Sequence, residues 1–441
     1  MGDKLLRVRE FDTITCNDDY KNEYKYLSED VFENVEQFIR EYTSSDGGAE
    51  ALDFLKVGYR KRVGKTISVN NYVGLIEVKG GHQIEVLPKI DFSDDFSSVE
   101  DADAETKRIF LKMLKTMKDF PGKSFNMASL DMSKMSLYEI FISMYIQEVR
   151  KLLRQGIKSS YISQNDNLNY YKGKLDITNH IKSNLVHKER FYMIFDEYVV
   201  DRPENRIVKA TLEKLRRIST SLDNQKEINK QLISFEFVNS SVNYQRDFSK
   251  IIIDRTTEQY RMLIEWSKIF LFNKSFTSFS GDNQSRALLF PMEKVYESYV
   301  AKNMKRVFGD EGWNVSAQDS KYYLFDEPKK FALRPDIVVN ASGKTIVMDT
   351  KWKKLIDDPS ANYGISQSDM YQMYAYAKKY HTTEIYLLYP MNKEMGDRRD
   401  ISYTSEDKVH VYVYFVDVSK IDESLGELKE IIKEKMERIF Y

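Results

Sequence analysis

The sequence has 441 residues, a formal net charge of −1, 31% charged residues and 42% hydrophobic residues. This length is too great for a single hydrophobic core and predicts two or three domains, while the composition excludes an intrinsically disordered chain. A single cysteine, Cys16, excludes a disulfide framework and a Cys-rich zinc site. Because the net charge is near zero, any nucleic-acid-binding surface must be local.

Residues 1–104 are predicted to form a β-rich domain with one helix. Apolar residues at helical spacing favour that helix at 30–42. Two alternating runs within 72–90, on either side of Gly80-Gly81, are typical of a β-hairpin. The acidic, Ser-rich segment 91–105 indicates a linker or an exposed loop.

Residues 105–283 are predicted to form a mainly helical domain. Amphipathic patterns favour helices at 136–157, 202–218 and 256–272. Residues 170–177 indicate a strand or loop that interrupts them.

From residue 284 to residue 441, predicted helices and strands alternate, which favours a mixed sheet with helices on its faces. The chain is therefore expected to be a multidomain α+β protein whose C-terminal domain is α/β. The expected helices lie near 291–308, 366–380 and from 421 onward, and the expected strands near 313–325, 331–339, 345–352, 384–389 and 409–417.

Neither a secretory signal nor a membrane span is predicted. The N-terminus has no apolar stretch of the signal-peptide kind, and the most apolar helical window, 260–272, is short and carries three charged side chains. We therefore expect a cytoplasmic protein.

The most informative stretch is 332–355, ALRPDIVVNASGKTIVMDTKWKKL, in which Asp336, Asp349 and Lys351 lie within two apolar runs. The runs are predicted to be neighbouring antiparallel strands, and Asp349 and Lys351 are two residues apart, so both project from one face. Asp336 begins the partner strand, and all three side chains are expected to meet at one end of the sheet. An alternative interpretation is a structural salt bridge at a strand end.

Two neighbouring carboxylates repel each other unless a positive charge neutralises them. A hard cation such as Mg²⁺ (or Mn²⁺) does so with carboxylate, carbonyl and water ligands, and the carbonyl of Thr350 is a candidate additional ligand. Lys351 would hold the attacking water or a phosphate oxygen. This arrangement indicates hydrolysis of a phosphodiester.

Basic residues surround the candidate site. Arg334, Lys353 and Lys354 are candidate contacts to the DNA backbone. A solvated strand edge protected by lysines is the other interpretation. Trp352 is expected to pack on the face opposite Lys351.

The pattern RPD followed by DTK resembles the PD-(D/E)xK nuclease motif, with Asp336, Asp349 and Lys351 at its positions. This resemblance implies an acidic residue on the helix before the hairpin, and Glu297 fits better than Glu293. It also implies Gln372 on the helix after the hairpin, where that residue would orient a site group or contact DNA.

Further stretches resemble the McrC family, the nuclease subunits of McrBC-type restriction systems. They are NYVGLIEVKGGHQIEVLPKI, FDEYVVDRPENRIVKATLEKL and SQSDMYQMYAYA. The resemblance implies an N-terminal region that docks on an AAA+ GTPase ring and stimulates its GTPase, a partner that recognises methylated cytosine, and a C-terminal domain that cuts double-stranded DNA. The chain has no Walker-type phosphate-binding motif, so we expect no nucleotide binding of its own.

The leading hypothesis is a Mg²⁺-dependent DNA endonuclease subunit of a modification-dependent (type IV) restriction complex. Asp336, Asp349, Thr350 and Glu297 would hold the metal, while Lys351 and Gln372 would complete the catalytic set. One rival is a non-enzymatic adaptor that activates the AAA+ motor through a purely structural nuclease fold. Another is a stand-alone nuclease of a repair or resolvase type.

Overall fold

The computed structural model describes residues 4–44, 54–92, 96–122, 125, 132, 135–272, 286–310, 312–341, 343–395 and 401–438. The chain forms two compact units, one made of Met1–Leu137 with Ser275–Tyr441 and the other of Tyr138–Lys274. These units differ from the three predicted domains, because the two ends of the chain share one unit. The predicted boundary after residue 104 falls inside helix α3 (Val99–Leu114), and the boundary after residue 283 lies outside the described residues.

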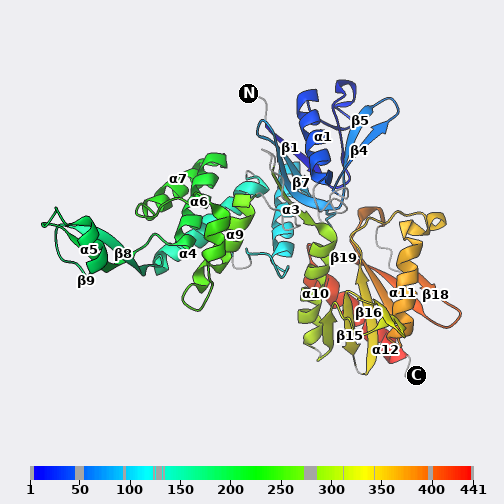
Figure 1. The fold of residues 1–441 in the computed structure, drawn as a ribbon. Coiled ribbons are helices and arrows are strands. Elements are labelled where there is room, and N and C mark those ends of the chain that lie inside the picture. Colours follow the sequence, from blue (N-terminus) through cyan, green and yellow to red (C-terminus); the bar gives the residue numbers. More distant parts are fainter. Residues whose placement is uncertain are drawn as a thin grey trace. The chain divides into compact units, whose positions relative to one another are not determined.

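Two four-stranded sheets form the N-terminal part of the first unit, in the orders β1-β7-β6-β11 and β3-β2-β5-β4. Figure 1 shows them beside helix α1, with β1, β7, β4 and β5 labelled. The predicted hairpin is confirmed as the antiparallel pair β6 and β7, and Gly80 and Gly81 adopt the positive φ angles that its turn requires. Strand β11 comes from the distant segment Arg286–Pro291 and completes the first sheet by pairing with β6. The other bounds are β1 Leu5–Arg9, β2 Thr13–Thr15, β3 Lys25–Tyr26, β4 Leu55–Arg60, β5 Gly64–Val69, β6 Tyr72–Val78 and β7 His82–Leu87.

The helix predicted at 30–42 is confirmed as α1 (Glu29–Ser44). Its residues Val31, Phe32, Val35 and Ile39 recur at helical spacing and are buried in one core cluster with strands of both sheets. The acidic segment predicted as a linker differs from expectation, because α3 begins within it. Ser98 caps this helix by accepting a hydrogen bond from the Asp101 amide.

The C-terminal part of the first unit is a six-stranded mixed sheet in the order β12-β15-β16-β17-β19-β18. The predicted strand 331–339 is in fact divided between β14, in a separate two-stranded sheet with β13, and β15. The bounds are β12 Asn314–Ala317, β13 Tyr323–Asp326, β14 Lys329–Ala332, β15 Ile337–Ala341, β16 Lys344–Thr350, β17 Glu384–Pro390, β18 Ser402–Thr404 and β19 His410–Val416.

Helices cover both faces of this mixed sheet (Figure 1). Helix α11 (Gln367–Lys379) packs Met373 and Tyr376 into a cluster with Val347 of β16. Helices α10 (Met292–Gly309) and α12 (Ile421–Arg438) contact each other and the sheet. Because side chains alternate along a strand, β16 residues with the parity of Val347 face α11.

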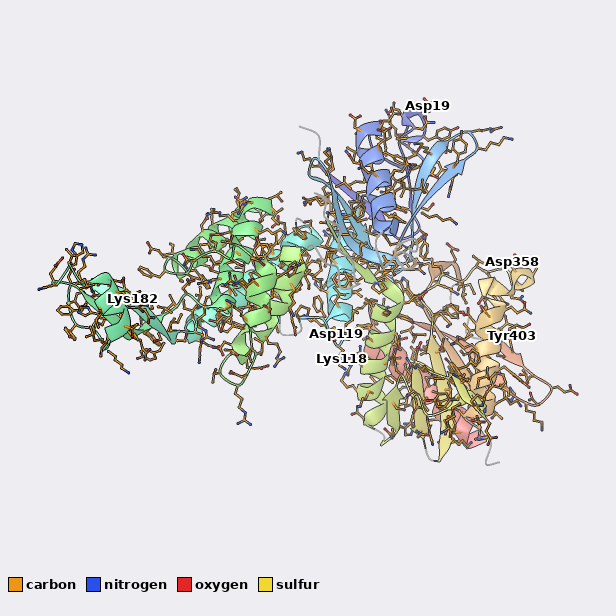
Figure 2. All side chains as sticks on the ribbon, viewed as in Figure 1. Asp19, Lys118, Asp119, Lys182, Asp358 and Tyr403 are labelled. Atoms are coloured by element: carbon orange, nitrogen blue, oxygen red, sulfur yellow. The ribbon has the colours of Figure 1, made fainter. Side chains whose placement is uncertain are left out.

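The second unit combines helices with a small sheet, of which only strand β9 lies in the segment 170–177 that was predicted to be a strand or a loop. Its strands have the order β8-β10-β9, and Lys182, labelled in Figure 2, lies on the neighbouring short helix α5. The buried Glu139 of α4 accepts hydrogen bonds from Ser219, Thr220 and Asn224, which ties α4 to the α6–α7 connection and to the first turn of α7. The bounds are α4 Leu137–Gln155, β8 Ser160–Leu168, β9 Lys174–Leu175, α5 Ile177–Ser183, β10 Phe191–Val199, α6 Pro203–Ile218, α7 Leu222–Ile233, α8 Tyr244–Lys250 and α9 Arg261–Phe272.

Within the described residues, none of the helices combines the length and the apolar character that crossing a bilayer requires.

Candidate active site

The candidate site lies where β15 begins and β16 ends. These strands pair antiparallel with Ile337 opposite Met348, so Asp336 and Asp349 occupy the next facing positions. Asp336 Oδ2 accepts hydrogen bonds from the amide and the hydroxyl of Thr350, at 2.7 and 2.6 Å. The structure thus brings together the two carboxylates that the sequence pattern singled out.

Lys351 follows β16 directly and projects from the same side as Asp349. Its Nζ lies 2.7 Å from Asp349 Oδ2, and its side chain is only 18% exposed. The amide of Lys351 donates to the carbonyl of Leu388, which continues the parallel pairing of β16 with β17 one residue further. The backbone that carries Lys351 is therefore fixed by the sheet.

Helix α11 supplies the other contacts of Lys351. Its Nζ donates to Gln372 Oε1 at 3.3 Å, and the Gln372 amide donates in turn to the Tyr376 hydroxyl at 2.8 Å. Asp369, which the sequence reasoning missed, lies 3.6 Å from Lys351 Nζ and 3.2 Å from Lys353 Nζ. Asp369 is three residues before Gln372, so its place on the same helical face was available as a signal.

Glu297 enters the site from α10. Its Oε1 accepts a hydrogen bond of 2.6 Å from the side-chain amide of Gln318. Burial and the nearby charge of Asp336 raise the pKa of Glu297 to about 7. Glu293 instead accepts a hydrogen bond from Asn71 at 3.3 Å, so Glu297 is the acidic residue of α10 that faces the candidate site.

Negative charge outweighs positive charge at this strand end. Burial raises the pKa of Asp336, and burial together with the charge of Asp336 raises the pKa of Asp349. Burial lowers the pKa of Lys351, but Asp349 and the other carboxylates more than offset this and raise it. Lys351 is therefore held as a cation, and its single charge is shared among several carboxylates.

The donor set fits a hard divalent cation with few protein ligands. Both hydrogen bonds from Thr350 end on Oδ2 of Asp336, which leaves Oδ1 of that carboxylate for a cation. Across the described residues, no group of three His, Cys, Asp or Glu side chains is arranged as a complete metal site. Mg²⁺ needs no such group, because it commonly binds through one or two carboxylates and keeps several waters.

The three basic residues predicted to contact DNA differ in their surroundings. Lys353 pairs with Asp369, and Lys354 Nζ lies 2.5 Å from Asp91 Oδ2. Arg334 is exposed. Trp352 packs on the opposite side from Lys351, as predicted: it is 3% exposed, and its ring centroid lies 5.2 Å from that of Tyr296 on α10.

Fold and site together define an α+β protein of two compact units, in which the C-terminal mixed sheet ends in a partly buried carboxylate–lysine cluster. The family model described as McrBC 5-methylcytosine restriction system component matches residues 67–390. This match spans most of the sequence, and the chain belongs to that family. No curated protein matches the sequence.

Two solved structures from Thermococcus gammatolerans share the fold. The refined half-complex from a tetradecameric assembly of McrB AAA+ hexamers with bound McrC contains a chain with a TM-score of 0.71 and 17% identity, covering 97% of this chain and 100% of that one. A chain of the cryo-EM McrBC complex has a TM-score of 0.51 and 17% identity, covering 69% of this chain and 88% of that one. At 17% identity the similarity shows a shared fold. The chemistry follows from the residues of the site.

Proposed function

We propose that this protein is the Mg²⁺-dependent DNA endonuclease subunit of a McrBC-type restriction complex. The observation that carries the proposal is the convergence of Asp336, Asp349 and Lys351 at the ends of β15 and β16, with Asp349 and Lys351 in contact at 2.7 Å. In this proposal the mixed sheet with α10 and α11 is a PD-(D/E)xK nuclease domain. Membership of the McrBC family supports it.

Asp336 and Asp349 would hold the cation, with Glu297 and the carbonyl of Thr350 as additional oxygen ligands. Mg²⁺ bound there would lower the pKa of a water and stabilise negative charge on the phosphate. Thr350 orients Asp336 through its two hydrogen bonds, and Asp349 is fixed by the pairing of β16 with β17.

Lys351 would donate hydrogen bonds to the attacking water or to a phosphate oxygen. Its raised pKa keeps it protonated at neutral pH, which favours a role as donor and electrostatic stabiliser over one as general base. Gln372 and Asp369 hold the ammonium group from α11. Exposed Arg334 remains a candidate contact to the DNA backbone, as do Lys353 and Lys354 if DNA displaces their carboxylate partners.

The proposed partner is a McrB-like AAA+ GTPase. In the similar Thermococcus structure, McrC is bound to McrB AAA+ hexamers, and the similarity covers almost the whole of this chain. The partner would recognise modified DNA and hydrolyse GTP, and this chain would stimulate that hydrolysis and cut the DNA. On its own the chain is expected to cut weakly or not at all.

The test compares wild-type protein with Asp349→Ala, each assembled with the AAA+ partner on methylated DNA. We expect the substitution to reduce cleavage at least about 100-fold and to leave GTPase stimulation intact. Asp407→Ala is the matched control, because Asp407 is an exposed carboxylate that contacts Lys378 and Tyr374 of α11 rather than Lys351. Continued cleavage by Asp349→Ala would refute the catalytic assignment. A wild-type complex that stimulates GTPase but never cuts DNA would support the adaptor hypothesis instead.

A further inference from the structure

The segment 351–354 directly follows β16, and its side chains alternate between two sets of partners. Lys351 and Lys353 contact Asp369 on α11, on the side of the candidate site. Trp352 and Lys354 contact residues of the N-terminal part of the same unit. The short stretch 351–354 is thus held from both sides at once, and one of its residues is the candidate catalytic lysine.

Glu10 makes the first N-terminal contact. The indole Nε1 of Trp352 donates to both carboxylate oxygens of Glu10, at 3.1 and 3.0 Å. The amide of Lys89 also donates to Glu10 Oε2, at 3.1 Å. The amide of Glu10 itself donates to the carbonyl of Leu87, so the residue is fixed at the end of the parallel pair β1 and β7.

Asp91 makes the second N-terminal contact, with Lys354, two residues after Trp352. Its Oδ2 lies 2.5 Å from Lys354 Nζ and also accepts a hydrogen bond of 3.2 Å from the amide of Lys393. Asp91 follows β7 closely, as Glu10 follows β1. The ends of two neighbouring strands of one N-terminal sheet therefore reach the segment that carries Lys351.

Burying the carboxyl group of Glu10 has a free-energy cost, which indicates that this residue has a specific role. Glu10 and Trp352 are 0% and 3% exposed, and within the described part of the chain the carboxyl group of Glu10 has N–H donors but no ion-pair partner. A buried carboxyl without a counter-charge destabilises a fold more than an apolar residue of similar size would. Its two hydrogen bonds with Nε1 restrain the ring of Trp352, which is the next residue after Lys351.

We propose that Glu10 and Asp91 are positioning residues of the nuclease site. Through the hydrogen bonds of Glu10 with Trp352 and the ion pair of Asp91 with Lys354, they hold Lys351 in its orientation toward Asp349. The inference rests on the proposed nuclease function for its effect on cleavage, but its structural content is independent of that function. Displacement of the N-terminal sheet from the segment 351–354 would remove these restraints on Lys351. The position of that sheet therefore determines how Lys351 is oriented in the site.

The test uses full-length protein, alone and assembled with the AAA+ partner. Glu10→Ala removes the acceptor, Trp352→Phe keeps the ring but removes its N–H, and Glu10→Gln keeps one acceptor oxygen. Glu36→Gln is the matched control: Glu36 is a buried carboxylate of α1 whose ion pairs are with Arg40 and Lys65. Each variant is measured by cleavage kcat and KM for DNA, by GTPase stimulation and by hydrogen exchange of the peptide 349–355.

We expect Glu10→Ala and Trp352→Phe to lower kcat about 10-fold, in the range found when outer partners of a catalytic group are lost. KM for DNA and GTPase stimulation should stay within about twofold. Exchange in 349–355 should accelerate, Glu10→Gln should restore most of the cleavage, and Glu36→Gln should behave as wild type. If Glu10→Ala does not fold, Trp352→Phe and Asp91→Asn replace it in the same measurements, with the same expected results.

Unchanged kcat and unchanged exchange in Glu10→Ala and Trp352→Phe would overturn the inference. So would a parallel loss of cleavage and GTPase stimulation, which would indicate a general structural role. The proposed function fails separately, if Asp349→Ala still cuts or the wild-type complex does not. In that case the exchange rates of 349–355 alone decide whether Glu10 and Asp91 fix this segment.

Discussion

The amide and the hydroxyl of Thr350 donate to one and the same oxygen of Asp336, at 2.7 and 2.6 Å. Since Thr350 lies between Asp349 and Lys351, this contact joins the two strands of the candidate site at the point where a cation would bind. The partner oxygen of Asp336 is thereby turned away from Thr350 and left for coordination.

Replacing Thr350 with Val should separate this orienting contact from the rest of the site. The change keeps the β-branched shape and the backbone carbonyl but removes the hydroxyl donor, so we expect about 10-fold weaker Mg²⁺ binding and a loss of about 1 kcal/mol of stability. Isothermal titration and thermal unfolding measure the two effects. Thr345→Val is the control, because Thr345 lies at the other end of β16 and donates to Asn340. Equal metal affinity in the two variants would rule out the orienting role.

Asp369 should control the pH range in which Lys351 stays charged. Asp349 and Asp369 raise the pKa of Lys351, although burial lowers it. Removing one of these carboxylates in Asp369→Asn should lower that pKa. We therefore expect the alkaline limb of the pH–rate profile for cleavage to move to lower pH, whereas Asp407→Asn should leave it in place. A profile unchanged by Asp369→Asn would mean that the ion pair with Asp369 does not raise the pKa of Lys351.

Binding of Mg²⁺ should release protons near neutral pH. Glu297 has a pKa of about 7, and those of Asp336 and Asp349 are also raised, so protons compete with the cation for these oxygens. Affinity for Mg²⁺ should rise as the pH increases from about 6 to about 8. Calorimetry in buffers of different ionisation enthalpy counts the released protons, and Glu297→Gln should reduce that number. Binding without proton release would contradict a carboxylate site of this kind.

The buried Glu10 should make stability depend on pH in a predictable direction. Burial raises its pKa to about 8, against the hydrogen bonds from Trp352 and Lys89 that lower it. Between its ordinary value and about 8, the folded state binds more protons than the unfolded state, so this contribution is complete at low pH and is lost as the pH rises through 8. The loss is at most about 1.4 kcal/mol per pH unit.

Thermal unfolding of wild type and Glu10→Gln across this pH window tests that prediction. The glutamine does not titrate, so the stability of wild type relative to the variant should fall as the pH rises. A difference that stays constant or moves the other way would show that Glu10 remains ionised in the folded protein.

The sequence predicted the core of the site because local rules determine it. Alternation along β16 placed Asp349 and Lys351 on one face, and the short connection between β15 and β16 set the register that brings Asp336 alongside. Helical spacing likewise located α10 and α11, whereas Glu297 and Gln372 were singled out on these helices by the resemblance to the PD-(D/E)xK motif. The catalytic and DNA-binding roles of these residues remain predictions.

Contacts between distant segments could not be predicted in this way. Glu10 and Trp352 are 342 residues apart, and no periodicity links them. Strand β8 was missed for a different reason: most of its residues are exposed or half-buried, so it shows no apolar alternation that would distinguish it from a loop. Strand β11 was missed as a member of the N-terminal sheet because its partner, β6, lies more than 200 residues earlier in the chain.

The most direct test is a crystal of the protein grown with Mn²⁺ and measured at the manganese absorption edge. We predict an anomalous peak between the carboxylates of Asp336 and Asp349, and its disappearance in Asp349→Ala. A well-ordered site without a peak at saturating Mn²⁺, with Asp349 held only by Lys351, would contradict the assignment of this strand end as a metal-dependent nuclease centre.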